Sequence, residues 1–277
     1  MKRTGALIAG LLAAAVAVTG CGTDGDAPAK PDAGRNEAGA ASKVVKVAAA
    51  SDLKFALDDV LKDFHKDNPN TKVEVSYGSS GNFATQLSNG APFDVFLSAD
   101  TSYPKKLEEA GLTVAGSQFD YAVGRLVVWA DKGRKFGIEA EGLKKLTDPS
   151  IRKVAIANPE HAPYGKAAVA ALKSAGVYEE VEPKLVMGDN IAQAAEFVTS
   201  GNADAGVIAL SLSKAGPMKD KGDVAEVDLE SYPRINQGGV IMKKASDAEA
   251  AKTFTAYLGS AKAHTVLKSY GFFLPGQ

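Results

Sequence analysis

The sequence predicts an α/β protein built from two lobes, each a sheet covered by helices. Short apolar runs alternate with segments whose apolar residues recur every three or four positions, which is the pattern of βαβ units. The chain has 277 residues, 45% hydrophobic and 23% charged, an ordinary composition for a protein with a sizeable core. The expected strands are too many for one sheet in about 230 residues of folded chain, so two lobes fit better.

The folded part is expected to start with a strand over 44–50. A helix follows, because Leu53, Leu57, Val60 and Phe64 recur at helical spacing. Further strands are expected over 72–77, 94–98, 126–130, 153–157, 184–187, 205–210 and 238–242. Helical patterns lie between most of these runs, so parallel sheets covered on both faces are predicted.

The first 20 residues have the pattern of an export signal. Lys2 and Arg3 precede an apolar run over 5–18, which suits a signal peptide and is too short for a permanent membrane span. The run ends in Val-Thr-Gly-Cys, similar to a bacterial lipobox, and Cys21 is the only cysteine. We therefore expect a lipoprotein signal peptide over 1–20 and a lipid on Cys21. An ordinary signal peptide that happens to contain a cysteine is the alternative.

The segment over 21–43 is expected to be the lipidated cysteine and a flexible tether. Residues 22–43 contain no aliphatic residue larger than alanine, so they cannot bury enough surface to offset the entropy of ordering. The mature protein would then be a monomeric module, anchored to the cell membrane by its lipid alone and facing outside.

The charge balance and the rare residue types exclude several classes of protein. The net charge is −1, from 33 acidic and 32 basic side chains, which argues against a nucleic-acid partner. One cysteine and three histidines rule out a disulfide framework and leave little material for a metal cluster. We expect no cofactor and no metal site in the protein itself.

Four loops follow strands and precede helical patterns, at 50–52, 77–82, 158–165 and 188–191. In an open parallel sheet, loops at the carboxyl ends of strands form the crevice that binds ligands. The first N–H groups of each helix lack an intrahelical acceptor, and serine hydroxyls such as those of Ser51 and Ser80 add donors. Several such helix ends together would form an anion site. The alternative is that both serines only cap helices.

No catalytic residue is assigned, and we expect a binding protein rather than an enzyme. The spacing in Gly78-Ser79-Ser80-Gly81 differs from the G-x-S-x-G turn of α/β-hydrolases. No base and orienting group accompany the serine in the sequence. An exported serine hydrolase using Ser80 and His161 stays a minor alternative.

Six segments of the sequence together resemble one family. They are VAAASDL (47–53), YGSSGNFATQL (77–87), APFDVFLSAD (91–100), NPEHAPYG (158–165), SGNADAGVIA (200–209) and SYGFFLP (269–275). From about Val44 to the C-terminus, the chain resembles the molybdate-binding proteins of bacterial ABC transporters, the ModA family of type II periplasmic-type binding proteins.

This resemblance implies a two-lobed clamp with an oxyanion in the cleft between the lobes. Lobe 1 would comprise 44–122 and 234–277, and lobe 2 would comprise 123–233, with hinges near Ala122 and Pro233. The ligand contacts carried over by motif fall on Ser51, Asp52, Ser80, Tyr164 and Ile191, the last through its backbone N–H. The implied function is the capture of molybdate or tungstate and its delivery to an ABC transporter permease.

The chain departs from the family pattern at two positions. Some relatives carry a tyrosine, whose hydroxyl reaches the ligand, where Ala209 stands here, and some follow the first serine with an apolar residue, where Asp52 stands here. The Tyr164 hydroxyl is a candidate for the missing donor, and a ring that only lines the lobe interface is the alternative. Asp52 is expected to turn away from the ligand, to cap its own helix and to leave binding nearly flat between pH 6 and 8.

The expected ligand class follows from the donors. Molybdate, tungstate and sulfate are dianions with acceptors only, so a site of hydroxyl and N–H donors suits them. Phosphate usually keeps a proton and benefits from an added acceptor. Sulfate and, because of Asp52, phosphate therefore remain alternatives to molybdate and tungstate.

Overall fold

The computed structural model describes residues 43–277. The predicted signal peptide, the lipid on Cys21 and the predicted tether lie outside the described residues, except for Lys43, which begins the first strand. Among residues 43–277, no helix is long and apolar enough to cross a membrane.

The first sheet has five strands in the order β2-β1-β3-β10-β4. Their bounds are β1 Lys43–Ala50, β2 Thr71–Gly78, β3 Val95–Ser98, β4 Phe119–Gly124 and β10 Ile235–Ile241. Strand β1 is parallel to β2 and β3, whereas β10 is antiparallel to β3 and β4. The sheet is therefore mixed, and only its β2-β1-β3 half has the predicted parallel arrangement.

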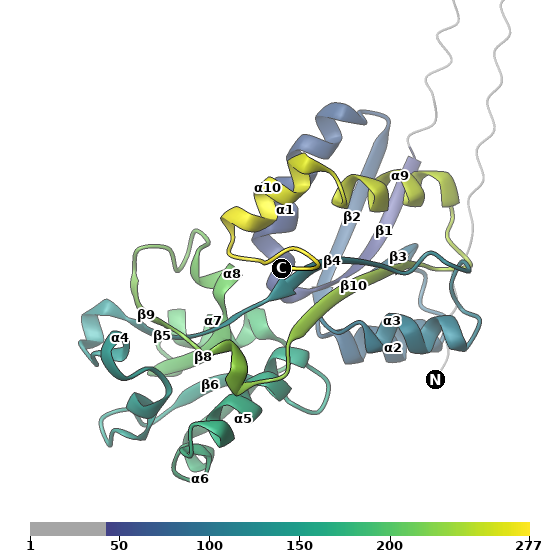
Figure 1. Cartoon of the computed structure of the whole chain (residues 1–277). Helices are drawn as coiled ribbons and strands as arrows, with labels where there is room; N and C mark the ends of the chain where they lie inside the picture. The colour runs from purple at the N-terminus through teal and green to yellow at the C-terminus, as the bar shows by residue number, and fades with distance from the viewer. Residues whose placement is uncertain (1–42) are drawn as a thin grey trace, which may run out of the picture. The chain divides into compact units, whose positions relative to one another are not determined.

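Helices cover both faces of this sheet (Figure 1). They are α1 Lys54–Asp67, α2 Ser80–Ser88, α3 Ser102–Glu109, α9 Ala248–Leu258 and α10 Ala261–Ser269. One core joins α1, α9 and α10 to alternate residues of β1 such as Val45 and Val47. A smaller core joins α2 and α3 to the opposite face through Ala48, Phe83 and Leu107. This alternation follows from the period of two in a strand.

The second sheet has five strands in the order β7-β6-β8-β5-β9. Their bounds are β5 Leu126–Asp131, β6 Val154–Ala157, β7 Leu185–Gly188, β8 Ala205–Ala209 and β9 Gly222–Glu226. Strand β6 is parallel to β7 and β8, and β5 is antiparallel to β8 and β9. Its helices are α4 Ile138–Glu141, α5 Pro163–Ser174, α6 Tyr178–Val181, α7 Ile191–Thr199 and α8 Leu210–Ser213. The predicted α/β architecture of two sheets is confirmed.

Five short 3-10 helices complete the described elements. They are η1 Ser51–Leu53, η2 Lys132–Arg134, η3 Gly142–Thr147, η4 Glu182–Lys184 and η5 Leu229–Ser231. The chain passes from the first sheet to the second at Arg125, between β4 and β5, and returns after η5 into β10. Both crossings lie within three residues of the predicted hinges, and the lobe boundaries themselves stay a prediction.

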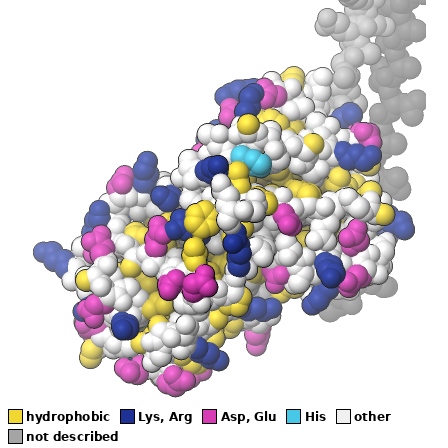
Figure 2. Space-filling model, in the orientation of Figure 1, with side chains coloured by type: hydrophobic (Ala, Val, Ile, Leu, Met, Phe, Trp, Pro, Cys, Tyr) yellow, Lys and Arg dark blue, Asp and Glu magenta, His cyan; other side chains and the backbone are white. Residues whose placement is uncertain are grey.

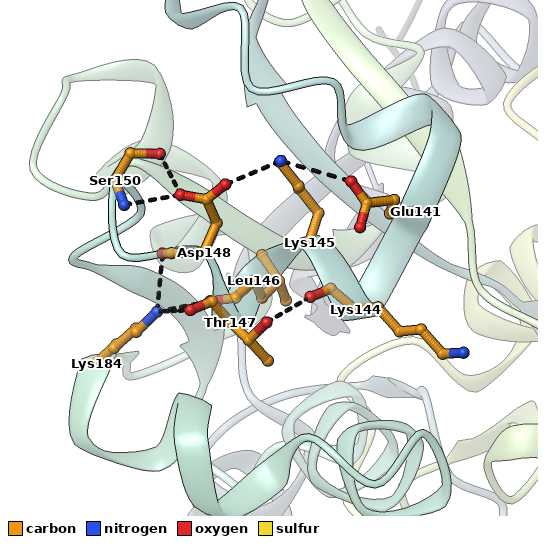
Figure 3. Close-up of polar contacts among 8 residues, drawn as sticks. All are labelled: Glu141, Lys144, Lys145, Leu146, Thr147, Asp148, Ser150 and Lys184. Carbon is orange, nitrogen blue, oxygen red and sulfur yellow. Dashed lines mark hydrogen bonds and ion pairs between the residues drawn. The ribbon is translucent and has the colours of Figure 1, made fainter.

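The end of η3 is held by a lysine (Figure 3). Lys184 Nζ donates to the carbonyl oxygens of Leu146, Thr147 and Asp148 at 2.9, 2.9 and 3.0 Å. These carbonyl groups lie at the end of a helix, where no further N–H group of the helix is available to donate to them. The Asp148 carboxylate accepts from Lys145 and Ser150, and these bonds hold its pKa well below the usual range. The contacts fix the chain just before β6.

Candidate functional site

The five predicted site residues line one small cavity. Two lie on the first sheet's η1, one begins α2, and the other two lie in the first turns of the second sheet's α5 and α7. The lining residues are Ala50, Ser51, Asp52, Gly78, Ser79, Ser80, Ala99, Ala162, Pro163, Tyr164 and Ile191. The strands that lead into these helices are β1 and β2 in the first sheet and β6 and β7 in the second. Each pair is parallel, so the carboxyl ends of the two strands lie at the same edge of their sheet.

The two sheets stand close together around this cavity. Its volume is about 10 Å³, which is at most the space that one water molecule requires. Ser51, Asp52 and Ser80 are 2%, 1% and 1% exposed. The structure therefore shows the closed arrangement of the cleft, and a tetrahedral oxyanion would need its walls to move apart slightly.

Three helix starts present unused backbone donors to the cavity. In the described part of the chain, the N–H groups of Ser80, Tyr164 and Ile191 form no hydrogen bond. Each stands in the first turn of its helix, where the N–H groups have no intrahelical acceptor and the helix dipole is positive. Pro163 fixes the first position of α5. These donors therefore meet at one cavity, where the sequence patterns predict that several helix starts form an anion site.

The two serines are positioned by hydrogen bonds that leave their protons free. Ser80 Oγ accepts from the N–H of Ala99 at 2.9 Å, and Ser51 Oγ accepts from the N–H of Ala192 at 3.2 Å. A hydroxyl has one proton to donate, and within residues 43–277 neither serine uses it. Both hydroxyls can therefore donate to a ligand in the cavity.

Other residues cap the helices. Ser79 is the N-cap of α2 and accepts from the N–H of Asn82 at 3.4 Å. Asn190 caps α7, and no side chain caps η1. The alternative in which Ser80 caps its own helix is wrong, because α2 begins at Ser80 itself, one residue earlier than a Ser80 cap requires. Ser51 reaches across to the start of α7 and leaves η1 uncapped.

Asp52 belongs to a buried group that joins the two sheets. Its Oδ2 accepts from the Tyr164 hydroxyl at 2.8 Å and from Gln237 Nε2 at 2.6 Å. Gln237 lies on β10, is fully buried, and also donates to the Tyr164 oxygen at 3.2 Å. The Ser211 hydroxyl donates to the Asp52 carbonyl at 2.8 Å. Sequence reasoning missed Gln237 and Ser211, which stand in no recognisable motif.

Burial raises the pKa of Asp52 to about 6. The bonds from Gln237 and Tyr164 lower this pKa, and the nearby N–H groups of Asp52 and Leu53 lower it further, without offsetting the loss of water. Oδ1 forms no hydrogen bond of normal geometry. Burial also raises the pKa of Tyr164 well above its usual range. This carboxyl therefore titrates near neutral pH.

Two expectations for Asp52 and one for Tyr164 need correction. The Asp52 side chain does not cap its own helix, because its bonds go to Tyr164 and Gln237. Its charge is not screened by solvent, because the residue is buried. The single hydroxyl proton of Tyr164 goes to Asp52, so this hydroxyl does not replace the donor missing at Ala209 while Asp52 is ionised. The backbone N–H of Tyr164 remains available.

Contacts at the mouth of the cavity also join the two sheets. The N–H of Gly81 donates to the carbonyl of His161 at 2.9 Å, and Ser79 Oγ is hydrogen-bonded to His161 Nδ1 at 3.0 Å. Asn82 Nδ2 donates to Asp189 Oδ1 at 3.2 Å. His161 is hydrogen-bonded to Ser79 and not to Ser80. The Ser80–His161 pair that the hydrolase alternative uses is therefore not formed in the described part of the chain.

The cavity contains no positive side chain. None of its lining residues is Lys, Arg or His. On the face drawn in Figure 2, basic and acidic side chains are interspersed over the surface. The donors at this site are thus neutral, and they suit a ligand that offers acceptors only.

Comparison with known proteins agrees with this geometry. A family model for bacterial extracellular solute-binding proteins matches residues 45–273. The molybdate-binding protein ModA of Azotobacter vinelandii is 43% identical over 230 residues, which cover 83% of this chain and 90% of that protein. The ModA protein of Rhodobacter capsulatus is also 43% identical, over 201 residues that cover 72% of this chain and 77% of the relative.

A solved structure matches the fold as well. The periplasmic molybdate-binding protein of Azotobacter vinelandii superposes with a TM-score of 0.78 and 33% sequence identity, over 83% of this chain and 99% of that chain. The range of the family model includes every loop of the cavity. The chain therefore belongs to the ModA family of bacterial extracellular solute-binding proteins.

Proposed function

We propose that this protein captures molybdate or tungstate outside the cytoplasm and presents it to an ABC transporter permease. The observation that carries the proposal is the cavity itself, where two serine hydroxyls and three unused N–H groups converge without a basic side chain. Molybdate and tungstate have acceptors only and match these donors. The relatives named for molybdate binding support the same ligand.

The ligand contacts in this proposal are the hydroxyls of Ser51 and Ser80 and the N–H groups of Ser80, Tyr164 and Ile191. Asp52 would line the site beside them. Because donors come from both sheets, a bound oxyanion would link the sheets and favour the closed cleft. The lobe division at 44–122 with 234–277 and at 123–233 is part of this proposal.

Calorimetric titration of residues 43–277 with molybdate, tungstate, sulfate and phosphate at one pH tests the ligand. We expect molybdate and tungstate to bind far more tightly than sulfate. Equal affinity for sulfate would overturn the choice of ligand.

Phosphate is the second candidate, because the unpaired Oδ1 of Asp52 is an acceptor that a protonated oxyanion could use. Tighter binding of phosphate than molybdate would favour it.

The anchor is proposed from the sequence alone. A lipid on Cys21, after removal of residues 1–20, would hold the protein at the outer face of the cell membrane, where a permease could receive the oxyanion. Metabolic labelling with a radioactive fatty acid tests this, since label is expected in the full chain and not in Cys21→Ala. Equal labelling of both would contradict it. An enzymatic activity is not proposed, because the relatives are solute-binding proteins.

A further inference from the structure

Asp52 poses a charge problem in a cavity that takes a dianion. Its carboxyl is 1% exposed and lines the same cavity as Ser51 and Ser80. One oxygen, Oδ2, accepts from Tyr164 and Gln237, while the other, Oδ1, forms no hydrogen bond. An ionised carboxylate beside a dianion, away from water, would repel it strongly.

No positive charge compensates Asp52. The titratable groups that face it are the hydroxyls of Tyr164 on α5 and Tyr121 on β4, and both have a pKa raised well above the usual range, so both are neutral. The largest influences on the pKa of Asp52 are burial and the hydrogen bonds from Gln237 and Tyr164, and none of them is a Lys, Arg or His. On the neighbouring α1 and α7, Lys54 and Glu196 pair with each other at 3.7 Å.

The remaining neighbours are neutral too. Gln237 on β10 contributes an amide, and α8 contributes the Ser211 hydroxyl, which binds the Asp52 carbonyl rather than its carboxyl. His161, at the mouth, is hydrogen-bonded to Ser79 and lies 3.7 Å from Asp189. Its imidazole lies outside the lining of the cavity.

We propose that Asp52 takes up one proton from solvent when the oxyanion binds, so that the protein captures a dianion and a proton together. The proton sits on Oδ1, while Oδ2 goes on accepting from Tyr164 and Gln237. Protonation turns an unpaired acceptor into a donor, and an acceptor-only dianion is the partner that such a donor needs. This inference rests on the proposed function and adds a regulation by pH to it.

The direction of the pH dependence follows from linkage. In the closed cleft, burial already raises the pKa of Asp52 to about 6, and a dianion beside it raises this pKa further. Above the ligand-free pKa, binding must then be accompanied by proton uptake, so affinity falls by up to about tenfold per pH unit until the pKa of the complex is reached. Well below pH 6 the carboxyl is already neutral, and affinity no longer depends on it.

Calorimetric titration with molybdate at pH 7.5, in two buffers of different ionisation enthalpy, counts the protons taken up. We expect close to one proton per molybdate in the wild type and none in Asp52→Asn. Between pH 6.5 and 8 the dissociation constant should rise about tenfold or more in the wild type and stay flat in the variant. Molybdate itself remains a dianion over this range.

Two variants serve as controls. His161→Gln removes the imidazole at the mouth, and Asp189→Asn removes the exposed carboxylate beside it. Both should keep the proton uptake of the wild type. Loss of uptake in His161→Gln, with uptake kept in Asp52→Asn, would assign the proton to the histidine and overturn the proposal.

A second measurement needs no variant. Infrared difference spectra of the wild type at pH 7.5 should gain the band of a protonated carboxyl when molybdate is added. Tight binding without this band and without proton uptake would overturn the inference and leave the proposed function intact. Absence of binding to any of the four oxyanions would instead overturn the proposed function itself.

Discussion

Ser80 shows how one residue can be both fixed in place and ready to donate. Its oxygen accepts from the buried N–H of Ala99, which holds the side chain in one orientation, and its proton is left for a ligand. A serine side chain that rotates freely would first have to be ordered when the ligand binds, at a cost in conformational entropy. The same arrangement recurs at Ser51 with the N–H of Ala192.

Ser80→Ala should therefore weaken molybdate binding. It removes one hydrogen bond to a charged group, worth about 1.5–3 kcal/mol, or roughly ten- to hundredfold in affinity. The protein should still fold, with a lower melting temperature, because the Ala99 N–H loses its acceptor. Ser213→Ala is the control, since that buried hydroxyl donates to the Leu210 carbonyl outside the cavity. A similar loss of affinity in the control would show that stability, not contact, carries the effect.

Tyr164→Phe should have an effect that depends on pH. The hydroxyl donates to the Asp52 carboxylate and favours its ionised form, whereas the bound form proposed above is protonated. Its loss should raise the pKa of Asp52 further, so we expect little change in molybdate affinity at pH 6 and a higher affinity than the wild type at pH 8. Titration calorimetry at the two pH values measures this. An equal loss at both would mean that the hydroxyl binds the oxyanion directly.

At the scale of elements, the site depends on how closely one helix start approaches a loop of the other sheet. The N–H of Gly81, in the first turn of α2, bonds to the His161 carbonyl. A Cβ on Gly81 would lie 2.6 Å from that oxygen and 2.9 Å from the His161 Cα. Any side chain there therefore acts as a wedge between the sheets without disturbing either one.

Gly81→Ala should hold the cleft open. We expect at least about a tenfold loss in molybdate affinity, with the melting temperature of the ligand-free protein nearly unchanged. Gly165→Ala should behave differently, because its Cβ would overlap the Ala157 carbonyl within the same sheet's layer and lower the melting temperature itself. Gly216→Ala is the neutral control, since nothing lies within 4 Å of its Cβ. Unchanged affinity in Gly81→Ala would contradict closure at this contact.

At the scale of the whole described molecule, binding and closure are one event. The polar contacts between the sheets include those of Asp52 with Tyr164 and Gly81 with His161. These few bonds leave the cleft free to open when no ligand links the two sides, and the crossings at Arg125 and before Ile235 are the places where the chain can bend.

Molybdate should therefore both contract and stabilise the protein. Small-angle scattering of residues 43–277 should show a smaller radius of gyration on adding molybdate. The stabilisation should reach about 2.7 kcal/mol at a ligand concentration one hundred times the dissociation constant, measured as a higher melting temperature. Sulfate at the same concentration is the matched control. Stabilisation without contraction would mean that the cleft is already closed when empty.

Local patterns in the sequence determined the fold class, the family and the loops of the site. The expected strands are all present, with shifts of one to three residues at their ends. Strands such as β1, β3, β6 and β8 are mostly buried, whereas β2 and β7 are only partly buried. Strands β4 and β9 were missed. Strand β9, with the sequence GDVAE, is only partly buried, so its hydrophobic pattern is weak, whereas β4 is mostly buried.

The partners within the site were decided by tertiary structure alone. Asp52 meets Tyr164 across 112 positions of sequence and Gln237 across 185, and no local periodicity contains such pairings. The burial that raises the pKa of Asp52 arises only when two sheets close over it. Sequence patterns alone therefore predicted a solvated carboxyl that caps its own helix. Hydrophobic periodicity acts within a few residues and builds each element, whereas the environment of a buried charge depends on which elements meet.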